Sequence, residues 1–362
     1  MARQRTIAVV TGTRAEFGLL EPVMRAVAGH ERLRLRTVVT GTHLLTASKR
    51  DIESAGFRID AEVEMQRVGE AGRLADAVGM GRGVTGIAKV LDELAPDFVV
   101  VLGDRIEAFA AASAASVAGV RVAHLHGGDR AEGVADEAMR HAITKLAHLH
   151  LPATAQSRRR ILRMGEPAQT VHRVGSPAID ALRSVEPAAD APELIVLHHP
   201  VGDEDETEGR RMRAILDATA GRSRIVLHPN HDPGRAGIMQ ALRSAEVQSV
   251  EHLPRTRFLS LLKGAKAIVG NSSAGLIEAA ALRTPCVNLG QRQAGREAPG
   301  HVVHCNDDAD PAAIAAAIDR ALQLDPRRLR HPYGRGDTGA RVAELLANLP
   351  LTDLPLRKRN TY

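Results

Sequence analysis

"DFVVVLGDRIEAFAAASAASVAGVRVAHLHGGD", residues 97–129, contains two short apolar runs with a helical pattern between them. The runs that begin at 97 and 120 are rich in Val, and the segment between them has helical apolar spacing and ends at Gly119. A strand, a helix and a second strand in this order predict two parallel strands joined by a crossover helix. The stretch therefore places the chain in the α/β class.

The same alternation continues along the chain. Further apolar runs that predict strands begin at residues 6, 35, 147 and 171, and again at 193, 223, 265 and 284. A Pro- and Ala-rich stretch, 175–193, separates the two series, and 362 residues exceed what one hydrophobic core usually holds. We therefore expect two Rossmann-like, doubly wound domains facing a cleft, over residues 1–178 and 179–345. A polar tail, 346–362, should follow, frayed or lightly docked.

The composition excludes several classes of protein. Hydrophobic residues make up 44% and charged residues 25%, as in ordinary soluble proteins. The formal charge of +5 is spread along the chain and aromatic residues make up only 2%, so we expect no nucleic-acid surface. Cys286 and Cys305 have no C-x-x-C spacing, which disfavours a disulfide framework or a structural zinc site. No apolar run is long enough for a signal peptide or a membrane span, so we expect a cytoplasmic protein.

Polar residues follow six of the predicted strands, in TGTR (11–14), LGDR (102–105), HLHGGD (124–129), LHHP (197–200), LHPN (227–230) and GNSS (270–273). Ligands of doubly wound folds bind beyond the carboxyl ends of the strands, so these endings predict a site. In HLHGGD, the histidines His124 and His126 could bind a metal, exchange protons with a substrate or contact it, or be structural. Their spacing leaves all of these open.

The GNSS ending runs into an apolar helical pattern. A helix that starts there would offer backbone N–H groups and the hydroxyls of Ser272 and Ser273 to a phosphate. Glu278 would lie about 9 Å further along the axis, within reach of ribose hydroxyls. Alternatively, one of the serines is an ordinary helix N-cap.

Two other segments need an interpretation. In DEAMRHAITKLAH (136–148), acids and bases alternate at i, i+4 spacing, which usually means a solvated helix face. Because this helix begins soon after HLHGGD, its acidic first turn should approach the same loop. GRGVTG (81–86) matches a dinucleotide fingerprint, but no buried strand precedes it, so we interpret it as a mobile glycine-rich loop.

GDR at 103–105, DEAMRHAITK at 136–145, NSSAG at 271–275 and GRE at 295–297, in this order, resemble the UDP-N-acetylglucosamine 2-epimerases, in particular their hydrolysing branch. The resemblance covers about residues 5–345. It implies the GT-B type of fold, with UDP held mainly by the C-terminal domain and the sugar in the cleft. We also expect a homo-oligomer, a dimer or a tetramer.

The reaction implied by this resemblance inverts sugar carbon 2 and releases UDP. A base removes the C2 proton as UDP leaves C1, which gives a 2-acetamidoglucal, and water then adds to yield N-acetylmannosamine. No metal or other cofactor is required.

The resemblance also assigns site residues. It places Asp104, Asp136, Glu137 and His199 in catalysis, and Arg14, Arg140, Ser272, Ser273, Glu278 and Arg296 in substrate binding. From the HLHGGD loop we add His126 as a catalytic residue and Asp129 as a substrate-binding residue. Arg14, the two serines and Arg296 would contact phosphates, and Glu278 the ribose. His199 would transfer a proton or support the leaving phosphate. The residue that abstracts the C2 proton stays open.

One position departs from the family pattern. Several relatives have a glutamate where this chain has His126. The imidazole could keep the proton-transfer role, or it could mark a UDP- or GDP-linked 2,4-diacetamido-2,4,6-trideoxy sugar of legionaminic acid-type synthesis. The chain could also be a GT-B glycosyltransferase or a sugar-nucleotide sensor without turnover. The acidic helix start at 136–137 favours the epimerase.

Overall fold

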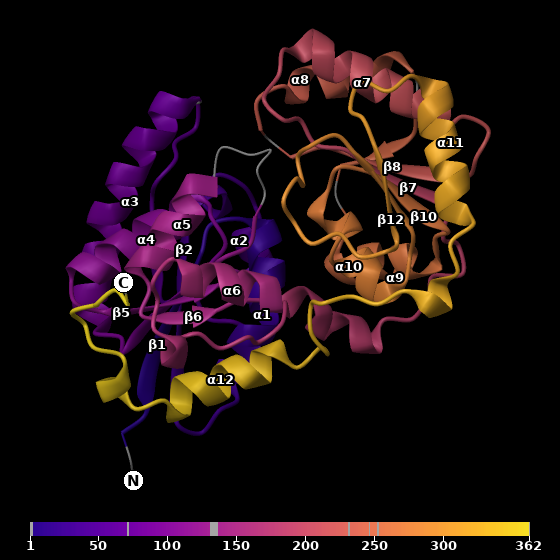
Figure 1. Ribbon diagram of the computed structural model, residues 1–362. Helices are drawn as coiled ribbons and strands as arrows, with labels where there is room; N and C mark the ends of the chain where they lie inside the picture. The colour runs from indigo at the N-terminus through magenta and orange to yellow at the C-terminus, as the bar shows by residue number, and fades with distance from the viewer. Residues whose placement is uncertain are drawn as a thin grey trace. The chain divides into compact units, whose positions relative to one another are not determined.

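The computed structural model describes residues 3–70, 72–130, 137–230, 232–245, 247–251 and 253–361. These residues form two compact units (Figure 1). The first contains the chain up to Asp129, residues 137–180 and the chain from Gly334 onward, and the second contains Ala181–Tyr333. Each unit has a six-stranded parallel sheet covered by helices. The predicted α/β class with two doubly wound sheets is therefore confirmed.

The first sheet has the strand order β3-β2-β1-β4-β5-β6. All its strands are parallel, and successive strands are added on one side of β1 up to β3 and on the other side from β4 onward. Its strands are β1 (Arg5–Thr11), β2 (Leu33–Thr40), β3 (Ala61–Val63), β4 (Phe98–Leu102), β5 (Arg121–Leu125) and β6 (Leu149–Leu151). The helices are α1 (Arg14–Ala28), α2 (Lys49–Ser54), α3 (Arg73–Leu94), α4 (Ile106–Val117), α5 (Glu137–Leu146), α6 (Ala155–Arg163) and α12 (Thr338–Asn348), with short 3-10 segments η1 (Gly41–His43), η2 (Ala168–Thr170) and η6 (Leu351–Asp353). The 3-10 segment η3 (Pro177–Ser184) begins in this unit and continues into the second. Every residue of β4 is buried, as expected for a central strand covered on both faces.

The second sheet has the strand order β12-β11-β10-β7-β8-β9. Successive strands are added on one side of β7 up to β9 and on the other side from β10 onward. Its strands are β7 (Leu194–Leu197), β8 (Arg224–Leu227), β9 (Ser249–Val250), β10 (Ala267–Gly270), β11 (Cys286–Leu289) and β12 (Val302–Cys305). The helices are α7 (Asp205–Ala218), α8 (Arg235–Ser244), α9 (Arg255–Gly264), α10 (Glu278–Leu282) and α11 (Pro311–Leu322), with η4 (Ser273–Gly275) and η5 (Pro326–Arg328). Because the strands of each sheet are parallel, their carboxyl ends lie along the same side of the sheet. The polar residues that follow the strands of each unit therefore lie along that side.

The chain from Gly334 onward belongs to the first unit, whereas the sequence placed residues 334–345 in the C-terminal domain. Helix α12 buries Val342 and Leu346 in the same core cluster as Leu20 of α1. The two helices approach closely at Gly339, where a Cβ would lie 2.4 Å from the Pro22 carbonyl oxygen. This packing explains why the helix returns to the first unit.

The interpretation of GRGVTG as a mobile loop was wrong, because the segment lies inside α3. Gly79, Gly83 and Gly86 lie on one face of this helix, at i, i+4 and i+7. A Cβ at Gly83 would lie 2.7 Å from the Met65 sulfur, and one at Gly86 would lie 2.5 Å from a Val63 methyl. The glycines therefore let the helix pack closely on the chain around β3.

The apolar run at 171 does not form a strand and contributes only an isolated bridge from Val171 to His150. Three strands that the sequence did not predict, β3, β9 and β12, are two to four residues long. Among the described helices, none combines the length and the apolar character needed to cross a membrane.

Candidate functional site

Arg140 organises the carboxylates at the edge of the first sheet. Asp104 follows β4, and Glu137 is the first residue of α5. The Arg140 guanidinium, 2% exposed, forms an ion pair with Asp104 through Nη2 and lies 2.6 Å from Glu137 Oε2 through Nη1. Nη1 also donates to the Asp129 carbonyl at 3.1 Å. One buried cation therefore holds two carboxylates, each about a fifth exposed, side by side at this edge.

His126 and Asp129 form a second buried pair. His126 Nδ1 lies 2.8 Å from Asp129 Oδ2, and its Nε2 lies 3.0 Å from the Ser176 hydroxyl. Because the carboxylate accepts, the neutral imidazole carries its proton on Nδ1, so Nε2 accepts from the Ser176 hydroxyl. The Ser157 hydroxyl donates to the other Asp129 oxygen at 2.6 Å. The ring is thus oriented by a carboxylate with its basic nitrogen available to a hydroxyl.

His124 has a structural position. Its ring is fully buried, with Nε2 2.7 Å from the Gly103 carbonyl and Nδ1 3.3 Å from the Thr144 hydroxyl. Burial lowers the pKa of His124 to about 3, so the ring is neutral at working pH. The imidazole links the turn that carries Asp104 to the helix that carries Arg140.

Arg14 is the first residue of α1 and forms an ion pair with Asp51 of α2 at 2.5 Å. The two side chains are 41% and 42% exposed, respectively. The sequence did not predict the neighbouring carboxylates Glu16 and Glu107 as part of the site. Burial raises the pKa of Glu16 to about 8, although its carboxylate accepts from the Gly12 backbone amide at 2.6 Å. The signal that could have revealed it is the T-x-x-E capping pattern at residues 13–16.

Glu107 is completely buried beneath the loop that follows β1. It accepts from Gln66 at 2.9 Å and from Arg105 at 3.3 Å. A Cβ at Gly12 would lie 2.4 Å from the Glu107 Cγ, so this loop requires glycine. Asp136, the remaining predicted catalytic residue of this unit, lies outside the described residues.

In the second unit, His199 lies just beyond β7 and is held by two neighbouring strand ends. Its backbone N–H donates to the Asn271 side chain at 2.7 Å, and Asn271 donates back to the His199 carbonyl at 2.8 Å. The Asn230 backbone amide donates to His199 Nδ1 at 3.1 Å, so the neutral ring carries its proton on Nε2. Burial, helped by the Arg292 charge, lowers the pKa of His199 well below its usual value. His199 is therefore a neutral hydrogen-bond donor.

The continuous helix predicted after GNSS is absent from the described chain at this point. Ser272 caps the three-residue segment η4, and the N–H groups of residues 274–277 bond to Ser272 and Ser273 within that turn. Helix α10 begins separately at Glu278. Ser272 is therefore an N-cap, which was one of the two alternatives, and a phosphate contact of the two serines stays a prediction.

Glu278 is 6% exposed and pairs with Arg255 at 3.3 Å. Arg296 lies in a turn after β11 that is closed by its backbone bond to the Gln293 carbonyl at 3.1 Å. Both residues belong to the second unit, together with Ser272, Ser273 and His199. Arg14, the remaining predicted phosphate contact, lies in the first unit.

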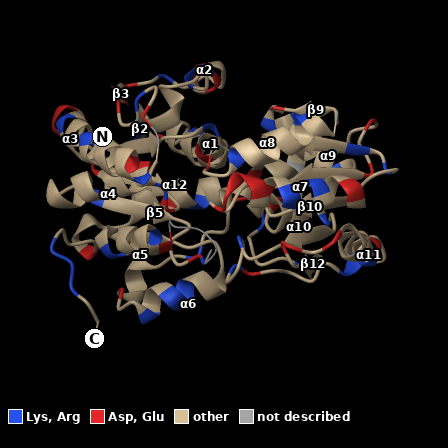
Figure 2. Cartoon of the chain, turned by 90° about the horizontal axis from the view of Figure 1, so that it is seen from above, with Lys and Arg blue, Asp and Glu red and all other residues tan. Residues whose placement is uncertain are grey.

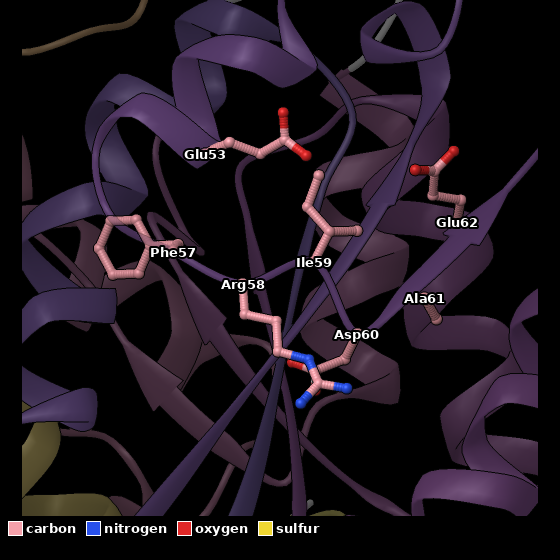
Figure 3. A pocket seen from close by; sticks show the side chains of 7 residues that line it. All are labelled: Glu53, Phe57, Arg58, Ile59, Asp60, Ala61 and Glu62. Carbon is pink, nitrogen blue, oxygen red and sulfur yellow. The ribbon is translucent and has the colours of Figure 1, made fainter.

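A surface hollow of about 460 Å³ lies elsewhere in the first unit, beside α2 and β3 (Figure 3). It is lined by Glu53, Phe57, Arg58, Ile59, Asp60, Ala61 and Glu62, and none of these is a predicted site residue. Charged residues of both signs lie on the helices of both units, but α6 carries only basic ones (Figure 2). Within the described residues, no group of three or more His, Cys, Asp and Glu could hold a metal ion.

The chain is similar to proteins of a known family. The family model described as UDP-N-acetylglucosamine 2-epimerase matches residues 25–347. The chain is 33% identical to a UDP-N,N'-diacetylbacillosamine 2-epimerase (hydrolyzing) of Legionella pneumophila, over 99% of this chain and 100% of that protein. It is 32% identical to a UDP-N-acetylglucosamine 2-epimerase of Neisseria meningitidis serogroup B, over 98% of both chains.

A crystal structure of the Methanocaldococcus jannaschii UDP-GlcNAc 2-epimerase, in complex with UDP-GlcNAc and UDP, has the same fold. The TM-score is 0.79 at 21% identity, with 94% of this chain and 99% of that chain covered. The family model and the two relatives matched over nearly their whole length show that this chain belongs to the UDP-N-acetylglucosamine 2-epimerase family.

Proposed function

We propose that this protein is a cytoplasmic, hydrolysing 2-epimerase of a UDP-linked 2-acetamido sugar, with UDP-N-acetylglucosamine as the first candidate donor. The observation that carries the proposal is the buried Arg140, which holds Asp104 and Glu137 together beside the oriented His126. The relatives named for UDP-N-acetylglucosamine and for UDP-N,N'-diacetylbacillosamine support this class of donor.

The first step is loss of UDP with removal of the C2 proton. Asp104 and Glu137 are held by one buried cation and are each about a fifth exposed, so a substrate can reach them. Either carboxylate could take the C2 proton while the C1–O bond breaks, and its electron pair leaves with UDP. A positioned general base contributes about a hundredfold or more to the rate.

The second step adds water across the C1–C2 double bond of the 2-acetamidoglucal. A proton is added to C2 on the face opposite to the one from which the first proton left. The hydroxide that remains from the water molecule adds to C1. His126 suits a proton-transfer role because Asp129 fixes its tautomer and leaves Nε2 basic. The product is the free, epimerised sugar.

The second unit would hold the nucleotide. His199 is a neutral donor at the end of β7, which suits a bond from Nε2 to a phosphate oxygen of departing UDP. Ser272, Ser273 and Arg296 would contact the diphosphate, and Glu278 the ribose. The Glu278 carboxylate already pairs with Arg255, so ribose hydroxyls would donate to a carboxylate that is held in place by this arginine.

A second donor is favoured by a specific observation. The relative matched over its full length at 33% identity is named for UDP-N,N'-diacetylbacillosamine, a 2,4-diacetamido sugar. By the resemblance to the family, His126 would also replace a glutamate of several relatives. We therefore propose a UDP-linked 2,4-diacetamido-2,4,6-trideoxy sugar as the second candidate donor for the same chemistry.

The test is proton NMR in deuterated water with each donor in turn and no acceptor sugar. We expect a free sugar with inverted C2 and deuterium at C2 from one of the two donors. The donor with the larger kcat/KM identifies the substrate. If both donors bind but neither releases UDP nor exchanges its C2 proton, the proposal is wrong for these donors.

A further inference from the structure

The segment that follows α12 is docked on the first unit, although the sequence predicted a frayed or lightly docked tail. Leu354 is 1% exposed and belongs to the core cluster of the first sheet. Arg121 of β5 donates to the carbonyls of Leu354 at 2.9 Å and Leu351 at 3.1 Å. The Thr361 amide donates to the Gly165 carbonyl at 3.0 Å. Figure 1 shows this yellow segment turning back after α12 and ending near β5.

Lys358 connects this segment to α5. Its ammonium lies 2.7 Å from the Lys145 carbonyl, 3.4 Å from the Thr144 carbonyl and 2.8 Å from Glu166 Oε2. An ammonium has three N–H groups, and each one has an acceptor here. The two carbonyls belong to the last turn of α5, where backbone oxygens have no partner within the helix. Lys358 therefore caps the C-terminus of α5 from a segment more than 200 residues away.

Lys145 completes the connection from the helix side. Its ammonium lies 2.6 Å from Glu166 Oε1, 2.7 Å from the Asn360 side-chain oxygen and 3.0 Å from the Met164 carbonyl. All three of its donors are also used. Glu166 thus bridges two ammonium groups, one on α5 and one on the docked segment.

The charges of this cluster favour the docked state. Glu166 is 2% exposed, which would raise its pKa, but bonds from His150, Lys145 and Lys358 lower the pKa to about 2. With Glu166 ionised and His150 neutral, two ammonium groups face one carboxylate. The remaining positive charge lies at the negative end of the α5 dipole, where a cation is favourable.

Helix α5 carries the site at its other end. It has ten residues, so its first turn, with Glu137 and Arg140, lies about 15 Å or less from the Lys358 contact. Arg140 anchors that turn to Asp104. A helix tied at both ends cannot tilt or shift along its axis without breaking one of the two connections.

We propose that the segment Leu351–Thr361 is a strap that fixes α5, and that Lys358 is the positioning residue through which the strap acts. Lys358 does not touch the reacting groups. It acts through α5, on the placement of Arg140 and the two carboxylates that Arg140 holds. The expected effect on turnover rests on the proposed function, whereas the expected effect on α5 does not.

The test compares Lys358→Met with Arg357→Met and Arg359→Met by amide hydrogen exchange followed by mass spectrometry. The two arginines flank Lys358 and are exposed, so they are matched controls for loss of a cation. We expect amides of residues 140–147 to exchange about tenfold faster in Lys358→Met and at wild-type rates in the controls. Amides of α7 in the second unit should exchange at the wild-type rate in all variants.

Turnover of the preferred donor provides the second readout. We expect Lys358→Met to lower kcat about tenfold with KM within twofold, and Lys358→Arg to restore most of the loss. If the wild type turns over neither donor, the proposed function fails while hydrogen exchange still tests the strap. Unchanged exchange of α5, or an equal change in Arg357→Met, overturns the strap. Faster α5 exchange with unchanged kcat overturns the positioning role of Lys358.

If Lys358→Met fails to fold, Asn360→Ala replaces it. This variant removes only the side-chain acceptor of Lys145, so we expect about threefold faster exchange confined to α5. Wild-type exchange in that variant would also overturn the proposal.

Discussion

Replacing Arg140 by Met tests whether one buried cation holds the candidate site together. The substitution keeps a long apolar side chain but removes the ion pairs to Asp104 and Glu137 and the bond to the Asp129 carbonyl. Breaking a fully buried pair by removing one partner costs about 3–5 kcal/mol. Because both carboxylates are about a fifth exposed, water can solvate them, and we expect the lower end, about 3 kcal/mol. At about 2–4 °C per kcal/mol, the unfolding midpoint of the first unit should fall by about 6–12 °C.

Differential scanning calorimetry and single-turnover kinetics measure the two consequences. Arg159→Met is the matched control, because this exposed arginine lies on α6. We expect the control to unfold within about 1–2 °C of the wild type, as is usual for exposed side chains (about 0.5 kcal/mol or less). We expect kcat to fall about a hundredfold or more in Arg140→Met and to stay within about twofold in the control.

A double-mutant cycle with Asp104→Asn isolates the pair. If Arg140 and Asp104 act together, the double variant should lose about 0.5–3 kcal/mol less stability than the two single losses added. Its kcat should be close to that of the worse single variant, because groups that act as a unit lose their effect together. Strictly additive stabilities, or a kcat within threefold of wild type in Arg140→Met, would refute the reasoning.

Three further predictions follow from the first unit. Gly86→Leu should lower the free energy of unfolding by about 1–3 kcal/mol in urea titrations, because its Cβ would meet a Val63 methyl; unchanged stability would mean that α3 is not packed there. His124→Phe should cost about 1–3 kcal/mol by leaving the Gly103 carbonyl without its donor, whereas the Thr144 hydroxyl keeps its bond to the Arg140 carbonyl. The loss should be equal at pH 6 and pH 8 because the ring is neutral at both, and a pH-dependent loss would contradict this. Glu16, whose folded pKa of about 8 exceeds its unfolded value, binds more protons in the folded state, so its stabilisation is complete below about pH 4.5 and is lost as pH rises through 8. Urea titrations of Glu16→Gln should show a smaller decline between pH 5 and 8 than the wild type, and an identical decline would refute the shift.

The central strands could be predicted from the sequence because burial on both faces requires continuous apolar runs. Strands β1, β4, β5, β7 and β10 follow this rule and lie close to their predicted positions. The edge strands β3, β9 and β12 could not be predicted, because two to four partly exposed residues give no such signal. Their partners in the sheet, rather than their own residues, decide that they are strands.

The sequence could predict which candidate site residues follow strands, but it could not predict which side chains contact one another. Asp104 and His199 follow predicted strands directly, so the doubly wound topology places each at the carboxyl edge of its sheet. The contacts of His126 with Ser176 and of Lys358 with Thr144 join residues 50 and 214 positions apart. No periodicity links such residues, and only the folded chain brings them together.

The two histidines of HLHGGD show how a single backbone angle separates structural from chemical roles. Strict strand alternation would place both rings on the same side of β5, as a metal site would need. His126 instead has a φ of +60°, so it leaves the strand conformation and its ring turns to Asp129 and Ser176. His124 stays in the strand and bonds to Gly103 and Thr144. A metal shared by the two rings would have to displace protein partners from both, and it would disconnect the Asp104 turn from α5. The arrangement therefore favours proton transfer at His126, supported by a neutral His124 that keeps the surrounding elements in place.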